Sequence, residues 1–108
     1  MIKADFFFSK KGQISGFCIR GHAMYGDPGE DIVCASVSSA AYMTANTLTE
    51  IVKVKTAIED ANDGMMKIVV STADRDRAKY FLEGLKLHIT ELAKMYPRNI
   101  RVNKKYIF

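Results

Sequence analysis

The chain has 108 residues, of which 48% are apolar and 26% are charged, and its formal net charge is +4. This length and composition are typical of a single globular domain, residues 1–108, with one hydrophobic core, and they exclude a disordered chain. The apolar runs are too short for a membrane span or a signal peptide, so we expect a cytoplasmic protein with no membrane association and two free thiols.

The first two predicted elements form a β-hairpin. Residues 2–9 alternate between apolar and polar side chains, as a strand does, and residues 13–20 are expected to return as a second strand after a Lys-Lys-Gly turn. Cys18 lies in the middle of the second strand, in step with Ile14 and Gly16, and is expected to be in the core.

A glycine-rich segment, GHAMYGDPGEDIVC, follows at residues 21–34. It contains three glycines, one proline and three acidic residues, a composition that predicts a loop. The predicted loop therefore has a histidine near its beginning, His22, and a cysteine at its end, Cys34.

The uncharged, small-residue segment after Cys34 predicts a helix that continues to about residue 52. Its inner stripe is expected to comprise Val37, Ala41, Thr44, Ala45, Leu48, Ile51 and Val52. The opposite face has a single charged residue, Glu50, which indicates that either the sheet or a second subunit covers it.

The second half of the chain predicts a further hairpin, a helix and a last strand. Residues 54–61 and 65–72 read as two strands joined by an Asp-Gly turn, and residues 99–108 read as a fifth strand. A second helix is predicted over residues 74–96, ended by Pro97. Its apolar stripe comprises Ala78, Phe81, Leu82, Leu85, Ile89, Leu92, Ala93 and Tyr96. The ββαββαβ order predicts an α+β fold, with two helices packed on one mixed sheet of about five strands.

Cys34 and His22 have the properties of a nucleophile and its base. A nucleophilic cysteine needs surroundings that favour its thiolate, a base, and donors for the developing oxyanion. Cys34 lies at the predicted start of the first helix, where the helix dipole favours a thiolate and the N–H groups of Cys34 and Ala35 are candidate oxyanion donors. Gly21 leaves the backbone before His22 free to aim the imidazole.

These residues also have ordinary structural interpretations. A cysteine is often a small core residue, and a loop histidine is often only solvated. Asp31 is expected either to cap the helix, by accepting the N–H of Val33 or Cys34, or to orient the His22 imidazole. The capping role would remove the Cys34 N–H from an oxyanion hole. No pair of histidines or cysteines has the close spacing of metal ligands, so we expect no metal and no cofactor.

The stretch GHAMYGDPGEDIVCASVS, residues 21–38, resembles the pattern GHA, five residues, G-x-DIVCA-x-VS, of the bacterial ribosomal-processing cysteine proteases called Prp. The chain length and the element order also fit, so the resemblance covers the whole chain. It implies a homodimeric cytoplasmic endopeptidase in which Cys34 is the nucleophile and His22 is the general base and acid.

The substrate implied by this resemblance is the N-terminal extension of a large-subunit ribosomal protein, cut shortly after paired phenylalanines and before a basic segment. The glycines Gly21, Gly26 and Gly29 would let the loop close over this substrate. Ser38 matches the final serine of the pattern and either touches the site or bonds its own helix backbone. The segment FFFSKKG at residues 6–12 resembles such a cleavage region, but a hairpin with a Lys-Lys-Gly turn is the preferred interpretation.

Two functions of other classes stay open at this point. One is a non-enzymatic ribosome- or RNA-associated binding protein, which would use the basic residues Arg98, Arg101, Lys104 and Lys105, although a solvated strand face explains these charges equally well. The other is a thiol redox protein, which the lack of a Cys-x-x-Cys motif disfavours.

Overall fold

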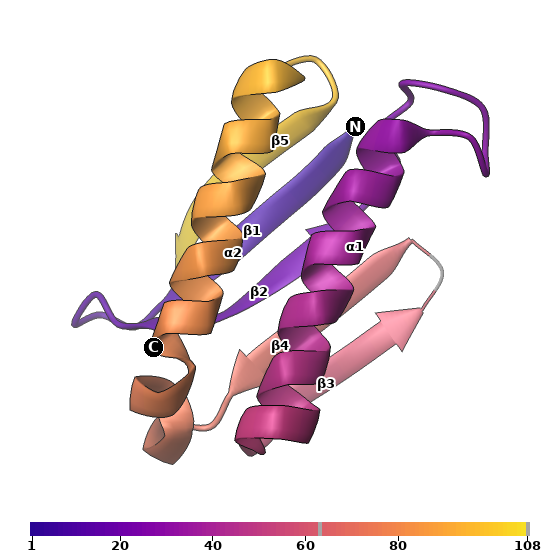
Figure 1. The fold of residues 1–108 in the computed structure, drawn as a ribbon. Helices are drawn as coiled ribbons and strands as arrows, with labels where there is room; N and C mark the ends of the chain where they lie inside the picture. The colour runs from indigo at the N-terminus through magenta and orange to yellow at the C-terminus, as the bar shows by residue number, and fades with distance from the viewer. Residues whose placement is uncertain (63, 108) are drawn as a thin grey trace.

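The computed structural model describes residues 1–62 and 64–107, and Figure 1 shows two helices on one face of a single sheet. The elements in chain order are β1 (Ile2–Phe8), β2 (Ile14–Arg20), α1 (Ile32–Asn46), β3 (Thr56–Asn62), β4 (Met65–Val70), α2 (Arg75–Met95) and β5 (Ile100–Tyr106). The predicted α+β fold and its ββαββαβ order are therefore confirmed. Asp63 of the predicted turn and Phe108 of the predicted last strand lie outside the described residues.

The sheet has the strand order β3-β4-β2-β1-β5 and is mixed, since β1 pairs antiparallel with β2 and parallel with β5. The antiparallel register sets Lys3 opposite Arg20, and the parallel register sets Ile2 opposite Ile100. The beginning of β1, the end of β2 and the beginning of β5 therefore meet at one end of the sheet. Figure 1 shows that α1 begins at this same end.

The core lies between the sheet and the two helices. Its fully buried side chains include Phe6, Phe17, Leu48, Ile68, Leu82 and Ile89. The three phenylalanines Phe6, Phe7 and Phe8 are buried in β1 and paired with β2 on one side and β5 on the other. The segment FFFSKKG thus forms the end of β1 and the turn that follows it, as the hairpin interpretation expects.

The prediction that Cys18 is in the core is wrong. A β-bulge at Ser15 inserts one residue into β2, so the alternation of faces changes phase between Ile14 and Phe17. Phe17 is fully buried against the helices, whereas Cys18 is half-buried and lies opposite Asp5 on the other face of the sheet. A sequence alternation cannot reveal this change, because the bulge depends on the pairing partner.

The regular α-helical part of the first helix ends at Asn46, earlier than predicted. A π-helical segment follows directly, over Thr47–Val52. The predicted inner residues from Val37 to Leu48 are buried, but Ile51 is 76% exposed. A π-helical turn contains more residues than an α-helical turn, so the helical phase shifts after Asn46 and Ile51 rotates outward. The outer face of α1 is exposed in the single chain, so of the two predicted alternatives cover by the sheet is wrong, and cover by a second subunit stays a prediction.

The second helix follows its predicted stripe closely. Ala78, Leu82, Leu85 and Ile89 are buried, whereas Phe81 is 42% exposed because it lies at the edge of the stripe, one position from Leu82. Of the helices in residues 1–62 and 64–107, none combines the length and the apolar character needed to cross a membrane.

A buried carboxylate joins three strands on the face of the sheet away from the helices. Asp5 in β1 is 2% exposed; its carboxylate accepts hydrogen bonds from Arg20 and from Nδ2 of Asn103, and it lies 3.2 Å from Nζ of Lys105. Burial alone raises the pKa of Asp5, but these three donors outweigh burial and hold the pKa below its usual range. The network ties β1 to both of its neighbours.

We expect Leu82→Ala to lower the free energy of unfolding by about 2–5 kcal/mol, because it leaves a cavity where a fully buried side chain packs between α2 and the sheet. Urea unfolding followed by circular dichroism measures this change. Leu87→Ala, at a 63% exposed position of the same helix, is the matched control and should change the stability little. Equal losses in the two variants would contradict the assignment of the core face.

Candidate active site

The loop that follows β2 begins with a glycine for steric reasons. Gly21 has φ +93°, and a Cβ atom at this position would lie 2.5 Å from the carbonyl oxygen of Met1. Its N–H donates to the carbonyl of Gly64 at 2.9 Å. A Cβ atom at Gly64 would in turn lie 3.3 Å from Nε2 of His22. Gly64 therefore leaves room for the His22 imidazole, and Gly21 leaves room for the carbonyl of Met1.

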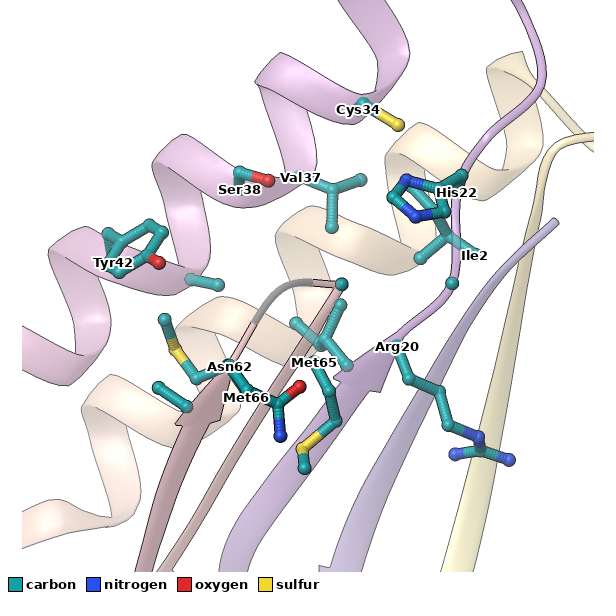
Figure 2. A pocket seen from close by; sticks show the side chains of 15 residues that line it. Ile2, Arg20, His22, Cys34, Val37, Ser38, Tyr42, Asn62, Met65 and Met66 are labelled. Carbon is teal, nitrogen blue, oxygen red and sulfur yellow. The ribbon is translucent and has the colours of Figure 1, made fainter. Parts of the chain in front are cut away.

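Cys34 lies in the first turn of α1 and is half-buried. Its Sγ accepts a hydrogen bond of 3.1 Å from the backbone N–H of Ala23, the residue next to His22. In Figure 2 the sulfur points from α1 toward the segment that carries His22. The loop thus returns to the beginning of the helix and brings its histidine to the same region as the cysteine.

Asp31 caps the helix, as one of its two expected roles requires. One carboxylate oxygen, Oδ1, accepts the N–H groups of Val33 and Cys34 at 2.9 and 3.0 Å. The other oxygen, Oδ2, accepts the N–H groups of Tyr25 and Gly26 at 2.9 and 3.1 Å. A single carboxylate therefore holds both the beginning of the helix and the middle of the loop, and the structure favours capping over orientation of the imidazole.

The expectation that the N–H groups of Cys34 and Ala35 are free oxyanion donors needs correction. The Cys34 N–H donates to the Asp31 carboxylate, and the Ala35 N–H donates to the Asp31 carbonyl at 3.0 Å. Neither group is free in this conformation, because the cap and the first helical hydrogen bond use them. Ala23 instead supplies the backbone N–H that reaches the sulfur.

The hydrogen bonds of Asp31 also explain its titration. The N–H of Cys34 contributes most to holding the pKa of Asp31 below its usual range, and those of Gly26, Tyr25 and Val33 act in the same direction. Burial acts in the opposite direction but does not outweigh them. The carboxylate is consequently an anion near Cys34 at neutral pH, and its charge opposes a thiolate there.

Two cavities meet at the predicted catalytic residues. One, the hairpin cavity, has a volume of about 400 Å³ and lies between α1 and the ends of β2, β3 and β4; the side chains of Ile19, Val37, Tyr42, Met65 and Met66 are among those that line it. The other, the loop cavity, has a volume of about 730 Å³ and is lined by residues of the loop, including Met24, Gly26, Asp27, Pro28 and Gly29. His22, Cys34 and Ser38 line both.

The predicted loop and site residues are thus brought together. Gly26 and Gly29 lie in the wall of the loop cavity, and Gly21 lies in the wall of the hairpin cavity. Ser38 is exposed, one turn along α1 from Cys34.

Sequence reasoning missed two contacts that hold the loop. The side-chain Nδ2 of Asn99 donates to the carbonyl of Ala23 at 2.9 Å, and the ring of Tyr25 packs edge-on against Tyr96 with centroids 5.3 Å apart. Asn99 and Tyr96 lie between α2 and β5, far from the loop in sequence. No local pattern identifies them, because only the fold brings these segments together.

Comparisons with known proteins give a consistent result. Residues 1–101 match the family model described as cysteine protease Prp. A protein from Staphylococcus aureus named ribosomal processing cysteine protease Prp is 28% identical over 106 residues, which cover 97% of this chain and 100% of that protein.

Two solved structures from S. aureus have the same fold. A crystal structure of an essential ribosomal processing protease Prp in complex with a covalently linked product peptide has a TM-score of 0.87 and 27% identity to this chain. A second, in complex with a substrate peptide, has a TM-score of 0.81 and 25% identity. Each similarity covers 97% of this chain and 100% of the other.

We expect Asp31→Asn to destabilise the protein at neutral pH, because a carboxamide has one acceptor oxygen and cannot accept all four N–H groups. A carboxylate with a lowered folded-state pKa stabilises the fold above its unfolded pKa of about 3.9, and this contribution is lost as the pH falls through the lower folded value. The stability difference between wild type and variant should therefore shrink in acid.

Thermal unfolding of both proteins between about pH 2 and pH 6 measures this difference. Asp27→Asn, an exposed acid in the same loop, is the matched control and should show no comparable loss at neutral pH. A difference between wild type and Asp31→Asn that stays constant down to the lowest pH would contradict the assigned role of the carboxylate.

Proposed function

This chain belongs to the cysteine protease Prp family and is a cysteine protease, and we propose on that basis that it removes the short N-terminal extension of a large-subunit ribosomal protein during ribosome assembly. The names of the relatives support this substrate, since they describe ribosomal processing proteases, two of them in complex with peptides. The proposed site of action is the cytoplasm, where such ribosomal proteins are made.

We assign the nucleophile to Cys34 and the general base and acid to His22. The observation that supports this assignment most strongly is the hydrogen bond from the Ala23 N–H to the Cys34 sulfur. In addition, Cys34 and His22 both line the two cavities. A half-buried cysteine and an imidazole that line the same two cavities support covalent peptide hydrolysis, which needs a thiol nucleophile with a base near it.

In the proposed reaction, His22 takes the proton of the Cys34 thiol, and the thiolate attacks the carbonyl carbon of the scissile peptide bond. The tetrahedral intermediate collapses to a thioester as the carbon–nitrogen bond breaks, and His22 gives its proton to the leaving amine. A water molecule, deprotonated by His22, then attacks the thioester carbonyl; the product acid leaves and the thiol of Cys34 is restored.

The two cavities support an extended substrate that crosses Cys34. Apolar side chains such as Met65 and Met66 in the hairpin cavity favour apolar substrate groups, whereas Asp27 in the loop cavity favours a basic segment. We propose that the loop closes over this peptide, with Gly26 and Gly29 giving it the freedom to do so and with Ser38 touching the substrate.

The alternatives from other classes are less favoured. A non-enzymatic RNA-binding function does not agree with membership of a protease family, and direct RNA contact by the basic last strand stays a prediction. Of the four basic residues near the C-terminus, Lys105 is paired with the buried Asp5. A redox pair of thiols is disfavoured by geometry, because Cys18 faces away from the helices whereas Cys34 lies on α1, across the sheet.

We further propose that two copies associate through the outer face of α1. Tyr42 and Met43 are 55% and 69% exposed on this face, and Ile51 extends it along the π-helical turn. Glu50 is the charged residue among them, and large exposed apolar side chains with so little charge are typical of an interface. A second copy of the chain would cover these side chains.

We expect Cys34→Ala to lower the rate of cleavage by at least about a thousandfold while peptide binding stays measurable, because the variant lacks the nucleophile but retains both cavities. Mass spectrometry of a peptide that spans the N-terminal extension of the same organism's ribosomal protein measures cleavage. Cys18→Ala is the matched control and should cleave at the wild-type rate. Turnover that persists in Cys34→Ala would exclude Cys34 as the nucleophile.

We expect light scattering after size-exclusion chromatography to give twice the mass of one chain, and Met43→Glu to give the mass of a single chain because it buries a charge in the proposed interface. Leu87→Glu, at an exposed position of α2, is the matched control and should leave the mass unchanged. A monomeric wild-type protein at micromolar concentration would exclude this interface.

A further inference from the structure

Asn99 is held rigidly in the connection between α2 and β5. Its backbone N–H donates to the carbonyl of Tyr96 at 3.0 Å, and its carbonyl accepts the N–H of Ile2 at 2.8 Å. These two backbone bonds are independent of the side-chain amide. Asn99 directly precedes β5, whose first residue pairs with Ile2, so the amide projects from the end of the sheet where β1 and β5 begin.

The side chain of Asn99 reaches the backbone of the loop beside the cysteine. Its Nδ2 donates to the carbonyl of Ala23 at 2.9 Å, although the two residues are separated by 76 positions. The N–H of the same Ala23 donates to the sulfur of Cys34 at 3.1 Å. Ala23 is 1% exposed, and its two backbone polar groups are thus bonded to Asn99 and to Cys34.

The backbone next to Ala23 needs such support. Met24 has φ +59°, in the left-handed region that residues other than glycine rarely occupy, and its side chain is 79% exposed. An exposed side chain gives little packing to hold this conformation, so hydrogen bonds have to do so. The peptide group between Ala23 and Met24 is the one whose oxygen Asn99 binds.

The contact between Ala23 and the sulfur has an electrostatic consequence. Asp31 already engages the N–H of Cys34 and places a carboxylate near it. Within residues 1–62 and 64–107, the Ala23 N–H is the backbone donor that the structure shows on the Cys34 sulfur. A hydrogen bond donated to a sulfur anion stabilises the anion, and its strength depends on the direction of the N–H.

We propose that Asn99 is a positioning residue of this site, which fixes the Ala23 backbone so that its N–H points at the Cys34 sulfur and the adjacent His22 keeps its place in the cavities that Cys34 also lines. This proposal deepens the proposed function, because it rests on Cys34 as the reacting thiol. Asn99 touches neither the sulfur nor the imidazole in this role and acts through the backbone of Ala23 alone.

The test measures the reactivity of Cys34 without any peptide substrate. Wild type, Asn99→Ala and Asn99→Leu are treated with iodoacetamide over a range of pH, and mass spectrometry of digested samples reports the alkylation of Cys34 separately from that of Cys18. The hydrogen bond to an anion is worth about a factor of ten or more, so we expect about tenfold slower alkylation of Cys34 at neutral pH in both variants. The pH midpoint of the rate should move upward, while alkylation of Cys18 stays unchanged.

The matched control is Asn103→Ala, which also removes a hydrogen bond donated by a side-chain amide in the same region of the chain, but to the carboxylate of Asp5 on the far face of the sheet. All variants are assayed below their unfolding temperatures, and Asn99→Leu keeps a side chain branched at Cγ, without the amide, if Asn99→Ala does not fold. An unchanged pH midpoint in a folded Asn99 variant overturns the proposal, and so does an equal shift in Asn103→Ala.

The alkylation readout and the peptide-cleavage assay together separate this proposal from the proposed function. If Cys34→Ala still cleaves peptide, the assignment of the nucleophile fails whatever the alkylation of the Asn99 variants shows. If Cys34→Ala is inactive but the Asn99 variants alkylate like wild type, the protease assignment stands and the positioning role of Asn99 is wrong.

Discussion

The carboxylate of Asp31 is the interaction on which the arrangement of the site depends. Its two oxygens accept four backbone N–H groups, two from the beginning of α1 and two from the loop that precedes it. An ordinary helix cap satisfies only the helix, whereas this one also gives the loop a fixed point six residues before the cap. The segment between β2 and Cys34 is consequently folded back on itself, and hydrogen bonds to the Asp31 carboxylate hold it in this conformation.

This use of Asp31 has an electrostatic cost at the sulfur. The cap occupies a helical N–H that would otherwise favour a thiolate and adds a negative charge in its place. The loop offsets the loss by presenting the N–H of Ala23 to Cys34. The surroundings of the thiol are therefore set by two segments together, and a helix N-terminus alone does not describe them.

The sequence predicted the parts of the molecule that depend on local patterns. The strands, the two main helices and the cap at Asp31 follow from alternation, helical spacing and the preference of aspartate for helix beginnings. The bulge at Ser15 and the π-helical turn after Asn46 did not, because each changes the phase of a pattern without changing its composition. The contact of Asn99 with Ala23 could not be predicted from local sequence patterns either, since only the parallel pairing of β1 with β5 brings the two segments together.

The large sequence separation between Ala23 and Asn99 also affects how the site forms during protein synthesis. During synthesis the chain leaves the ribosome from its N-terminus, so the thiol, the imidazole and their loop emerge long before the residue that anchors them. Until the last strand pairs with β1, the loop lacks its most distant hydrogen bond and the entropy of closing that long loop has not been overcome. The complete geometry around Cys34 therefore forms only after Asn99 and the β5 residues that follow it have been made and β5 has paired with β1.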